Sequence, residues 1–263
     1  MIRVVTISIA LLVAPALVAQ ERGATQTPPA PPPAARAAAP IDLTGYWVSI
    51  VTEDWRWRMV MPPKGDYQSV PITAEAKRAA DSWDPAKDES IGEQCRAYGA
   101  GGIMRMPTRL HITWLDDNTL KVETDAGMQT RLLHFRSWKS EGRATWQGDS
   151  AAEWDLPARA GGAGGAPGAG EGAKEQPKFG SLKVVTTNMR PGYLRKNGVP
   201  YSAKARLTEY WDLHKGRNGE QWLVVSTVVD DPTYLQVPWL TSPNFRKEPD
   251  GSKWDPTPCS ARR

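Results

Sequence analysis

Glu209 is the residue of this chain whose neighbours in sequence best suit it to chemistry. The alternation of apolar and polar residues over 207–213 places its carboxylate on the same strand face as two leucines and a tryptophan. Burial on such a face disfavours the charged form of a carboxylate, which suits it to act as a general acid or base. If the protein is an enzyme, His111 or an arginine is the candidate partner in that catalysis.

A structural role is the alternative for Glu209. A buried carboxylate is commonly paired with an arginine, and Arg56 and Arg109 are the two candidates for that partner. Arg109 and His111 also belong to a row of alternating polar residues in one strand, and Glu123 belongs to a similar row in the next. Such rows either line a polar ligand site or face water. Arg109 and Glu123 are therefore candidate ligand-binding residues.

The aromatic residues offer a second kind of candidate site. The chain has 12 tryptophans against 3 phenylalanines, and we expect most of them in the core, although aromatic rings also line ligand pockets. Trp55 and Trp57 alternate with arginines, so their strand has one aromatic and one cationic face. Residues 190–201 form a basic loop with Tyr193 and Tyr201, and loops of this kind carry many binding sites. These four aromatic residues are candidate ligand-binding residues, with a purely structural role as the alternative.

The three histidines raise the question of a metal site. Turns expected at 116–118 and 125–127 place His111 and His134 five or six residues apart along the sheet. That spacing corresponds to roughly 16–20 Å at about 3.3 Å per residue, too far for one ion. His214 lies at a strand end and is expected to face water. The common nucleophile, zinc and dinucleotide motifs are also absent from the sequence, so we expect neither a metal nor a cofactor.

Regular elements must hold these side chains in position. The alternation of apolar and polar residues between turns predicts that most of these elements are β-strands. A helix is expected over 74–83, where Thr73 provides an N-cap and Pro85 a stop, with a shorter helical turn near 88–94. Strands are expected over 45–51, 55–61, 109–115, 118–125, 128–135, 144–149, 181–189, 205–213 and 220–230. Successive strands joined by short turns favour one antiparallel barrel or sandwich.

The chain divides into segments of different composition. Residues 1–19 have the positive start, apolar run and small residues of a signal peptide, and residues 20–40 form a Pro/Ala-rich tether. Residues 41–263 are expected to be a single barrel domain with a disordered Gly/Ala-rich insertion at 157–180. Because no other apolar run is long enough to span a bilayer, we expect a periplasmic or secreted protein without a transmembrane segment in its mature form.

Cys95 and Cys259 are the only cysteines. Two cysteines in an exported chain most simply form one disulfide, with two separate thiols as the alternative. A disulfide would tie the C-terminus to the middle of the domain.

The charge balance argues against one class of partner. The chain has 33 Lys and Arg against 29 Asp and Glu, a net charge of +4, and no long basic run. Because nucleic-acid-binding proteins concentrate positive charge in a patch, we expect no nucleic-acid partner.

The tripeptide Gly45-Tyr46-Trp47, at the start of the first strand, resembles the Gly-x-Trp signature of the lipocalins. The resemblance implies an antiparallel, lipocalin-like (calycin-type) barrel whose tryptophan packs across the closed end and whose interior holds an apolar ligand. The expected fold is this barrel with one short helix after the second strand. Residues 181–188 and 207–210 are also similar to a broad group of secreted bacterial proteins of unknown function, which implies export and a barrel-like fold.

Three functions remain open at this point. The first is a binding or carrier protein whose barrel takes a small apolar or amphipathic molecule. The second is a barrel enzyme, an isomerase, lyase or hydrolase, that uses Glu209 for acid–base chemistry. The third is an envelope protein that binds a partner through the basic loop at 190–201 and the Pro-rich tether.

Overall fold

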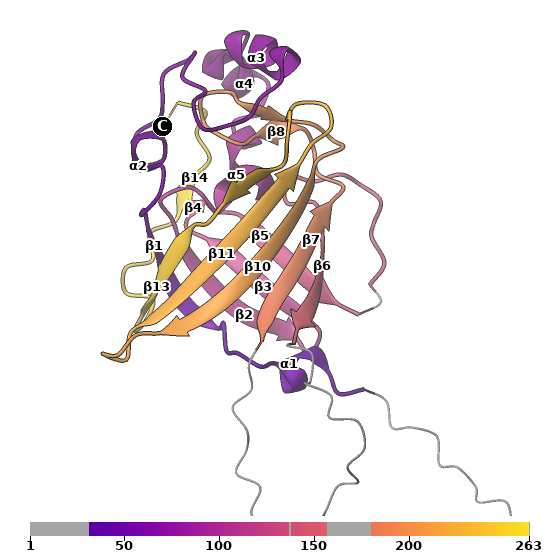
Figure 1. Ribbon diagram of the computed structural model, residues 1–263, viewed down its shortest axis with the longest axis vertical. Coiled ribbons are helices and arrows are strands. Elements are labelled where there is room, and N and C mark those ends of the chain that lie inside the picture. The colour runs from indigo at the N-terminus through magenta and orange to yellow at the C-terminus, as the bar shows by residue number, and fades with distance from the viewer. Residues whose placement is uncertain (1–31, 137, 157–179, 263) are drawn as a thin grey trace, which may run out of the picture. The chain divides into compact units, whose positions relative to one another are not determined.

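Nine strands close into a ring of hydrogen-bonded neighbours in this computed structural model, which describes residues 32–136, 138–156 and 180–262 (Figure 1). In order around the ring they are β10 (Arg206–Lys215), β7 (Ser181–Thr187), β6 (Asp149–Asp155), β5 (Thr130–Phe135), β3 (Thr119–Thr124), β2 (Arg109–Asp116), β1 (Gly45–Ile50), β13 (Asn244–Glu248) and β11 (Gln221–Asp230). The antiparallel ladder between β11 and β10 closes the ring. The expected all-β barrel is therefore confirmed.

The barrel belongs to one compact unit, Pro33–Arg263. The signal peptide expected at 1–19, most of the tether at 20–40 and nearly all of the insertion at 157–180 lie outside the described residues. No helix in the described ranges is both long and apolar enough to cross a membrane.

One strand pair departs from the expected antiparallel pattern. β6 runs parallel to β5, with Leu133 opposite Ser150 and Phe135 opposite Ala152. The strand expected at 144–149 instead begins at Asp149, because the chain after β5 first returns to the end of the barrel at which β5 started. A parallel pair requires such a return connection, and the sheet is therefore mixed.

The second expected strand, at 55–61, is wrong. Asp54 has a left-handed backbone with φ of 48°, and a short helix, α2 (Trp55–Arg58), follows it. The alternation of tryptophan and arginine predicted a strand with one aromatic and one cationic face, but in the helix Trp55 is 68% exposed and Arg58 is buried. Arg58 donates from Nε to the carbonyl oxygen of Arg105, at 2.7 Å, and this bond holds the guanidinium inside.

The expected helix exists, but it follows the first strand instead of the second. It is α3 (Ala74–Asp81), and the Thr73 hydroxyl accepts a hydrogen bond from the Ala76 amide at 3.1 Å, as an N-cap does. A further helix, α4 (Pro85–Ser90), begins at the proline that was expected only to end α3.

The meander of β2, β3 and β5 confirms the expected strands and nearly all of the expected register. His111 pairs with Glu123, as expected, and His134 pairs with Thr119, one residue from the expected position. The two histidines are therefore four residues apart along β3, against the expected five or six.

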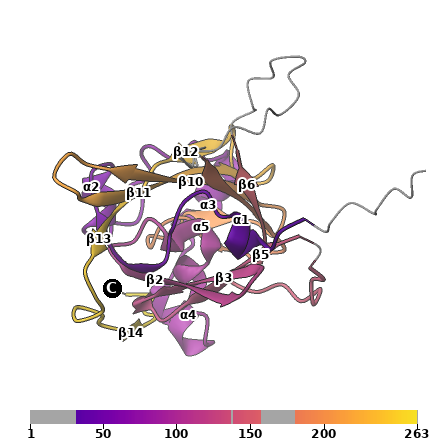
Figure 2. The ribbon, with the colours of Figure 1, turned by 90° about the horizontal axis from the view of Figure 1, so that it is seen from below.

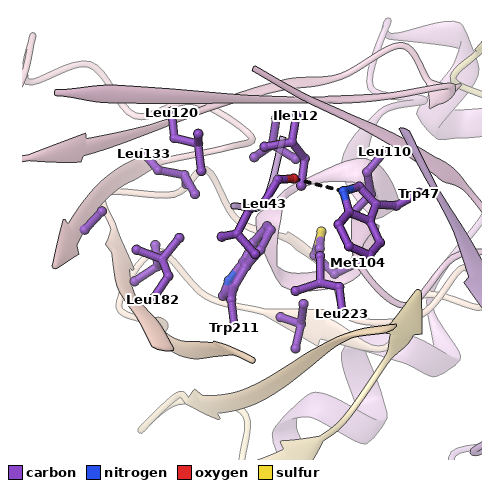
Figure 3. Packing of buried hydrophobic residues seen from close by; sticks show 14 of the residues in the cluster. Leu43, Trp47, Met104, Leu110, Ile112, Leu120, Leu133, Leu182, Trp211 and Leu223 are labelled. Atoms are coloured by element: carbon purple, nitrogen blue, oxygen red, sulfur yellow. Dashed lines mark hydrogen bonds between the residues drawn. The ribbon is translucent and has the colours of Figure 1, made fainter. Parts of the chain in front are cut away.

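Apolar side chains from all parts of the ring fill the barrel. Trp47 and Trp211 have no exposed surface and pack among leucines from several strands (Figure 3). The indole nitrogen of Trp47 donates to the carbonyl oxygen of Leu43 at 2.9 Å, which ties the segment before β1 to the core.

A short helix, α1 (Ala35–Ala38), covers one end of the barrel (Figure 2). The Ala35 amide donates to the Asn118 side chain at 3.0 Å, and the Trp154 indole donates to the Ala35 carbonyl at 2.8 Å. These bonds join α1 to the turn between β2 and β3 and to β6.

The smaller elements gather at the other end (Figure 1). They are η1 (Arg96–Tyr98), α5 (Ala100–Ile103), β4 (Ala126–Gly127), β8 (Gly192–Tyr193), β9 (Pro200–Tyr201), β12 (Trp239–Thr241) and β14 (Thr257–Pro258). β12 extends the sheet beside β11, and the remaining small strands pair in twos.

A buried ion pair crosses the inside of the barrel between β5 and β10. Both nitrogens at the tip of Arg131 donate to Glu209, at 3.1 and 2.5 Å, and neither side chain is exposed. Arg131 also donates to the Thr186 hydroxyl at 3.3 Å, and Thr186 in turn bonds with Ser150 at 2.7 Å. Together these bonds link β5, β6, β7 and β10, four consecutive strands of the ring, from the inside.

We predict that Glu209→Leu and Arg131→Leu each lower the free energy of unfolding by about 3–5 kcal/mol, because each leaves the opposite charge buried and unpaired. The double variant removes both charges and should lose much less than the sum of the two. Urea denaturation of the three variants measures this. Additive losses would show that the two charges do not stabilise each other.

Candidate functional site

A cleft of about 690 Å³ is lined by segments from the end of the barrel away from α1. Four segments far apart in sequence form its walls: residues 57–62, residues 102–107 around the end of α5, the loop at 194–196, and the C-terminal segment at 257–262. This volume falls within the range of small-molecule sites in proteins, roughly 300–1,000 Å³.

One wall of the cleft is apolar. Met59, Val60 and Met61 follow α2 and are exposed to solvent, with Val60 69% exposed. Met106 and Pro107 continue this wall. Large apolar side chains exposed to water in a concave site favour binding of an apolar group. The bound group covers these side chains and removes their apolar surface, together with its own, from contact with water.

A second wall carries buried positive charge, centred on Arg105. Its two terminal nitrogens pair with Glu53 at 3.0 Å and Asp54 at 2.7 Å. Arg58 lies 3.8 Å from the Glu53 carboxylate, and Arg195 lies 3.9 Å from that of Asp54. Three arginines therefore share two carboxylates as ion-pair partners.

Burial perturbs two of these arginines. Desolvation, and after it the positive charge of Arg105, lowers the pKa of Arg58 to about 10. The same two causes lower the pKa of Arg195 to about 10. Both guanidinium groups remain charged at neutral pH.

Aromatic rings hold the guanidinium groups in place. Arg195 lies over the Trp57 ring, 5.1 Å from its centroid, and Arg105 lies over the Trp239 ring at 4.7 Å. Contacts at these distances are cation–π interactions. Trp57 is thus the one predicted tryptophan that lines the cleft, and it also packs against the cationic wall.

The C-terminal wall is fastened by the disulfide between Cys95 and Cys259, which confirms that prediction. The Thr257 amide donates to the Asp125 carbonyl at 2.9 Å within the β14–β4 pairing. Tyr98 adds a bond from its hydroxyl to the Ser260 carbonyl at 3.3 Å.

The structure does not bring Glu209 and His111 together. Glu209 points into the barrel and pairs with Arg131, and neither Arg56 nor Arg109 is its partner. His111 lies on the outside, stacked on Tyr46 with ring centroids 4.2 Å apart. Because successive residues of a strand point to opposite faces, His111 faces outward while its neighbours in β2 face the core.

Arg109 and Glu123 also lie on the outer face. Arg109 pairs with Glu248 at 3.0 Å, and Glu123 lies 3.1 Å from the His111 ring and 3.0 Å from Lys121. These residues form a half-buried charged surface, and none of them lines the cleft.

Tyr193 and Tyr201 support the loop that carries part of the cleft. Tyr193 donates its hydroxyl hydrogen to Asp88 at 2.9 Å and accepts a bond from Arg96 at 3.3 Å. Tyr201 is fully buried, and its ring touches Gly101 and Gly192 so closely that a larger side chain at either glycine would collide with it. The neighbouring residues at 194–196 line the cleft.

Sequence reasoning missed most of the cleft. Arg58, Met59 and Met61 were assigned to a strand, and Arg105 was not singled out. The loop at 190–201 was singled out, and it supplies three of the lining residues. The expected disulfide was the one signal that could have placed the C-terminal segment near residue 95.

Neither a family model, nor a curated protein, nor a solved structure matches this chain.

We predict that removal of the disulfide, in a Cys95→Ser/Cys259→Ser variant, lowers the free energy of unfolding by on the order of 5 kcal/mol, given a separation of 164 residues. Amide exchange should become faster at Thr257 and Ser260 because this segment opens locally. The amides of the β10–β11 ladder should still exchange only through global unfolding. Hydrogen-exchange mass spectrometry tests this. Unchanged exchange at 257–260 would show that the disulfide does not hold this wall.

The Tyr193 hydroxyl should make stability depend on pH. Burial, with the bond to Asp88, raises the pKa of Tyr193 to about 12 against the opposing effect of Arg96. Because the folded pKa lies above the unfolded value near 10, the contribution is complete below about pH 10 and lost as pH rises toward 12. The difference in unfolding free energy between the protein and Tyr193→Phe should therefore shrink between about pH 10 and 12. A constant difference would contradict the shift.

Proposed function

We propose that this protein is a binding or carrier protein for a small apolar or amphipathic molecule, which it holds in the cleft at the end of the barrel. The observation that carries the proposal is the apolar wall at 59–61, which leaves large side chains exposed inside a concave site of about 690 Å³. Surface apolar residues gathered in a cleft are a common feature of ligand sites.

The proposed position differs from the barrel interior that the lipocalin resemblance implied. The interior contains packed side chains such as Trp47 and Trp211, together with the Arg131–Glu209 pair. The proposed ligand instead lies outside the ring, among the segments that join its strands. Several of these segments are tied down by the disulfide, by cation–π contacts and by ion pairs, so the site requires little ordering on binding.

We further propose that the barrel is lipocalin-like and that the protein is exported to the periplasm or secreted. The apolar N-terminal sequence supports export, and the disulfide is typical of oxidising compartments. The fully buried Trp47 of the Gly45-Tyr46-Trp47 tripeptide supports the lipocalin-like reading.

The contacts and burial of Glu209 do not favour a role in acid–base catalysis. Its carboxylate is held by Arg131 and has no exposed surface, so substrate would have to displace a buried ion pair to reach it. We therefore propose no second function.

We predict that the double variant Met59→Gln/Met61→Gln binds N-phenyl-1-naphthylamine, an uncharged fluorescent apolar probe, about tenfold more weakly than the protein does. Both side chains are partly or largely exposed, so the substitutions should leave the fold intact. Fluorescence titration measures the dissociation constants.

The matched control is Met128→Gln, since Met128 is 60% exposed and lies outside the cleft. It should bind the probe as the unsubstituted protein does. An equal loss in the control, or no loss in the double variant, would show that the probe does not bind at the apolar wall.

A further inference from the structure

The cationic side of the cleft has fewer carboxylates than positive groups. Among the described residues, its cations are Arg58, Arg105, Arg195 and Lys196. Glu53 and Asp54 are the two carboxylates that pair with the arginines. Lys196 donates to the uncharged Tyr98 hydroxyl at 2.8 Å. This side of the cleft therefore holds two positive charges in excess.

The remaining charged groups near the cleft are matched. Arg262 pairs with Glu89 at 2.7 Å on the C-terminal wall. Asp66, whose charge also acts on Arg195, pairs with Arg56 at 3.2 Å. The excess is thus confined to the wall around Arg105.

We propose that the ligand is an anionic amphiphile. Its single carboxylate, phosphate or sulfate group lies against Arg58, Arg195 and Lys196, and its apolar body lies along residues 59–61. This inference rests on the proposed binding function and specifies the chemical class of the ligand.

Unused hydrogen-bond donors support this assignment. Nη2 of Arg58 and Nε of Arg195 are buried and have no hydrogen-bond partner within the described part of the chain. A buried donor without an acceptor is unfavourable, and guanidinium groups bind carboxylates and phosphates through several donors at once. An anionic group that enters the cleft and displaces these side chains slightly toward itself would supply the missing acceptors.

The arginines are also held in position before any ligand binds. Arg195 donates to the Gln68 carbonyl at 2.7 Å and to the Ser69 hydroxyl at 2.6 Å. Arg58 is held by its bond to the Arg105 carbonyl. A cationic wall already held near its binding position needs only a small shift and loses little conformational entropy when an anion binds, and this favours a charged ligand over an uncharged one of the same shape.

The burial of Arg58 and Arg195 is a third reason to expect an anionic ligand. The pKa of Arg58 and that of Arg195 are both lowered because their charges lie away from water and near Arg105. A negative group beside them would offset this mutual repulsion. An uncharged or cationic ligand would leave it in place or increase it.

The experiment compares four amphiphiles that share a ten-carbon chain and differ in their head group: decanoate, decyl phosphate, decanol and decyltrimethylammonium. Each is used to displace N-phenyl-1-naphthylamine from the protein. We expect at least one of the two anions to compete about tenfold more strongly than decanol, and the cation to compete more weakly than decanol. The order of decanoate and decyl phosphate then identifies which anionic head the site prefers.

Variants locate the head group. Lys196→Gln should weaken the preferred anion about five- to tenfold and leave decanol unchanged, because the substitution removes charge and keeps the hydrogen-bonding reach. Arg58→Lys, which keeps the charge but removes the planar donor set, should weaken the anion without affecting decanol. Lys253→Gln is the control, since Lys253 is exposed and lies outside the cleft.

The outcomes separate this inference from the proposed function. If the probe binds and decanol competes as well as both anions, the anionic ligand class is wrong and the apolar binding function stands. The same conclusion follows if Lys196→Gln weakens decanol and the anions equally. If neither the probe nor any amphiphile binds, both proposals fail.

Discussion

Closure of the barrel by the β10–β11 ladder is the constraint on which the rest of this structure depends. In a closed ring every second side chain of each strand points inward, so the interior must be filled by side chains or enclose a cavity. Here Trp47, Trp211 and a set of leucines fill it, and the Arg131–Glu209 pair spans the polar layer among them. The large cleft accordingly lies where the chain leaves the ring, in the segments that connect the strands.

Among the described residues, the buried arginines form two sets that differ in charge balance. Arg131 meets one carboxylate in a two-point contact, so its charge is matched and the pair connects strands. The group around Arg105 shares two carboxylates among three arginines and opens onto the cleft. Incomplete pairing of buried charge lowers stability, and proteins tolerate such departures mainly at functional sites. This contrast separates a structural arginine from those that we assign to binding.

The cleft also depends on contacts between distant parts of the chain. Its C-terminal wall contains only the two-residue strand β14, and short edge pairings of this kind open easily. The Cys95–Cys259 disulfide holds this wall against the middle of the chain. A site assembled in this way keeps its shape although its walls contain little regular structure.

Local patterns in the sequence were sufficient for the meander, for β10 and β11, for the helix capped by Thr73 and for the disulfide, because each depends on neighbouring residues or on the presence of only two cysteines. Alternation failed at 55–61, where tertiary burial of Arg58 outweighed the strand pattern. The partner of Glu209 could not be predicted either, since Arg131 lies 78 residues away and many cations compete in the sequence. Strand order, the parallel β5–β6 pair and the cleft arise from long-range packing, which periodicity within a segment does not encode.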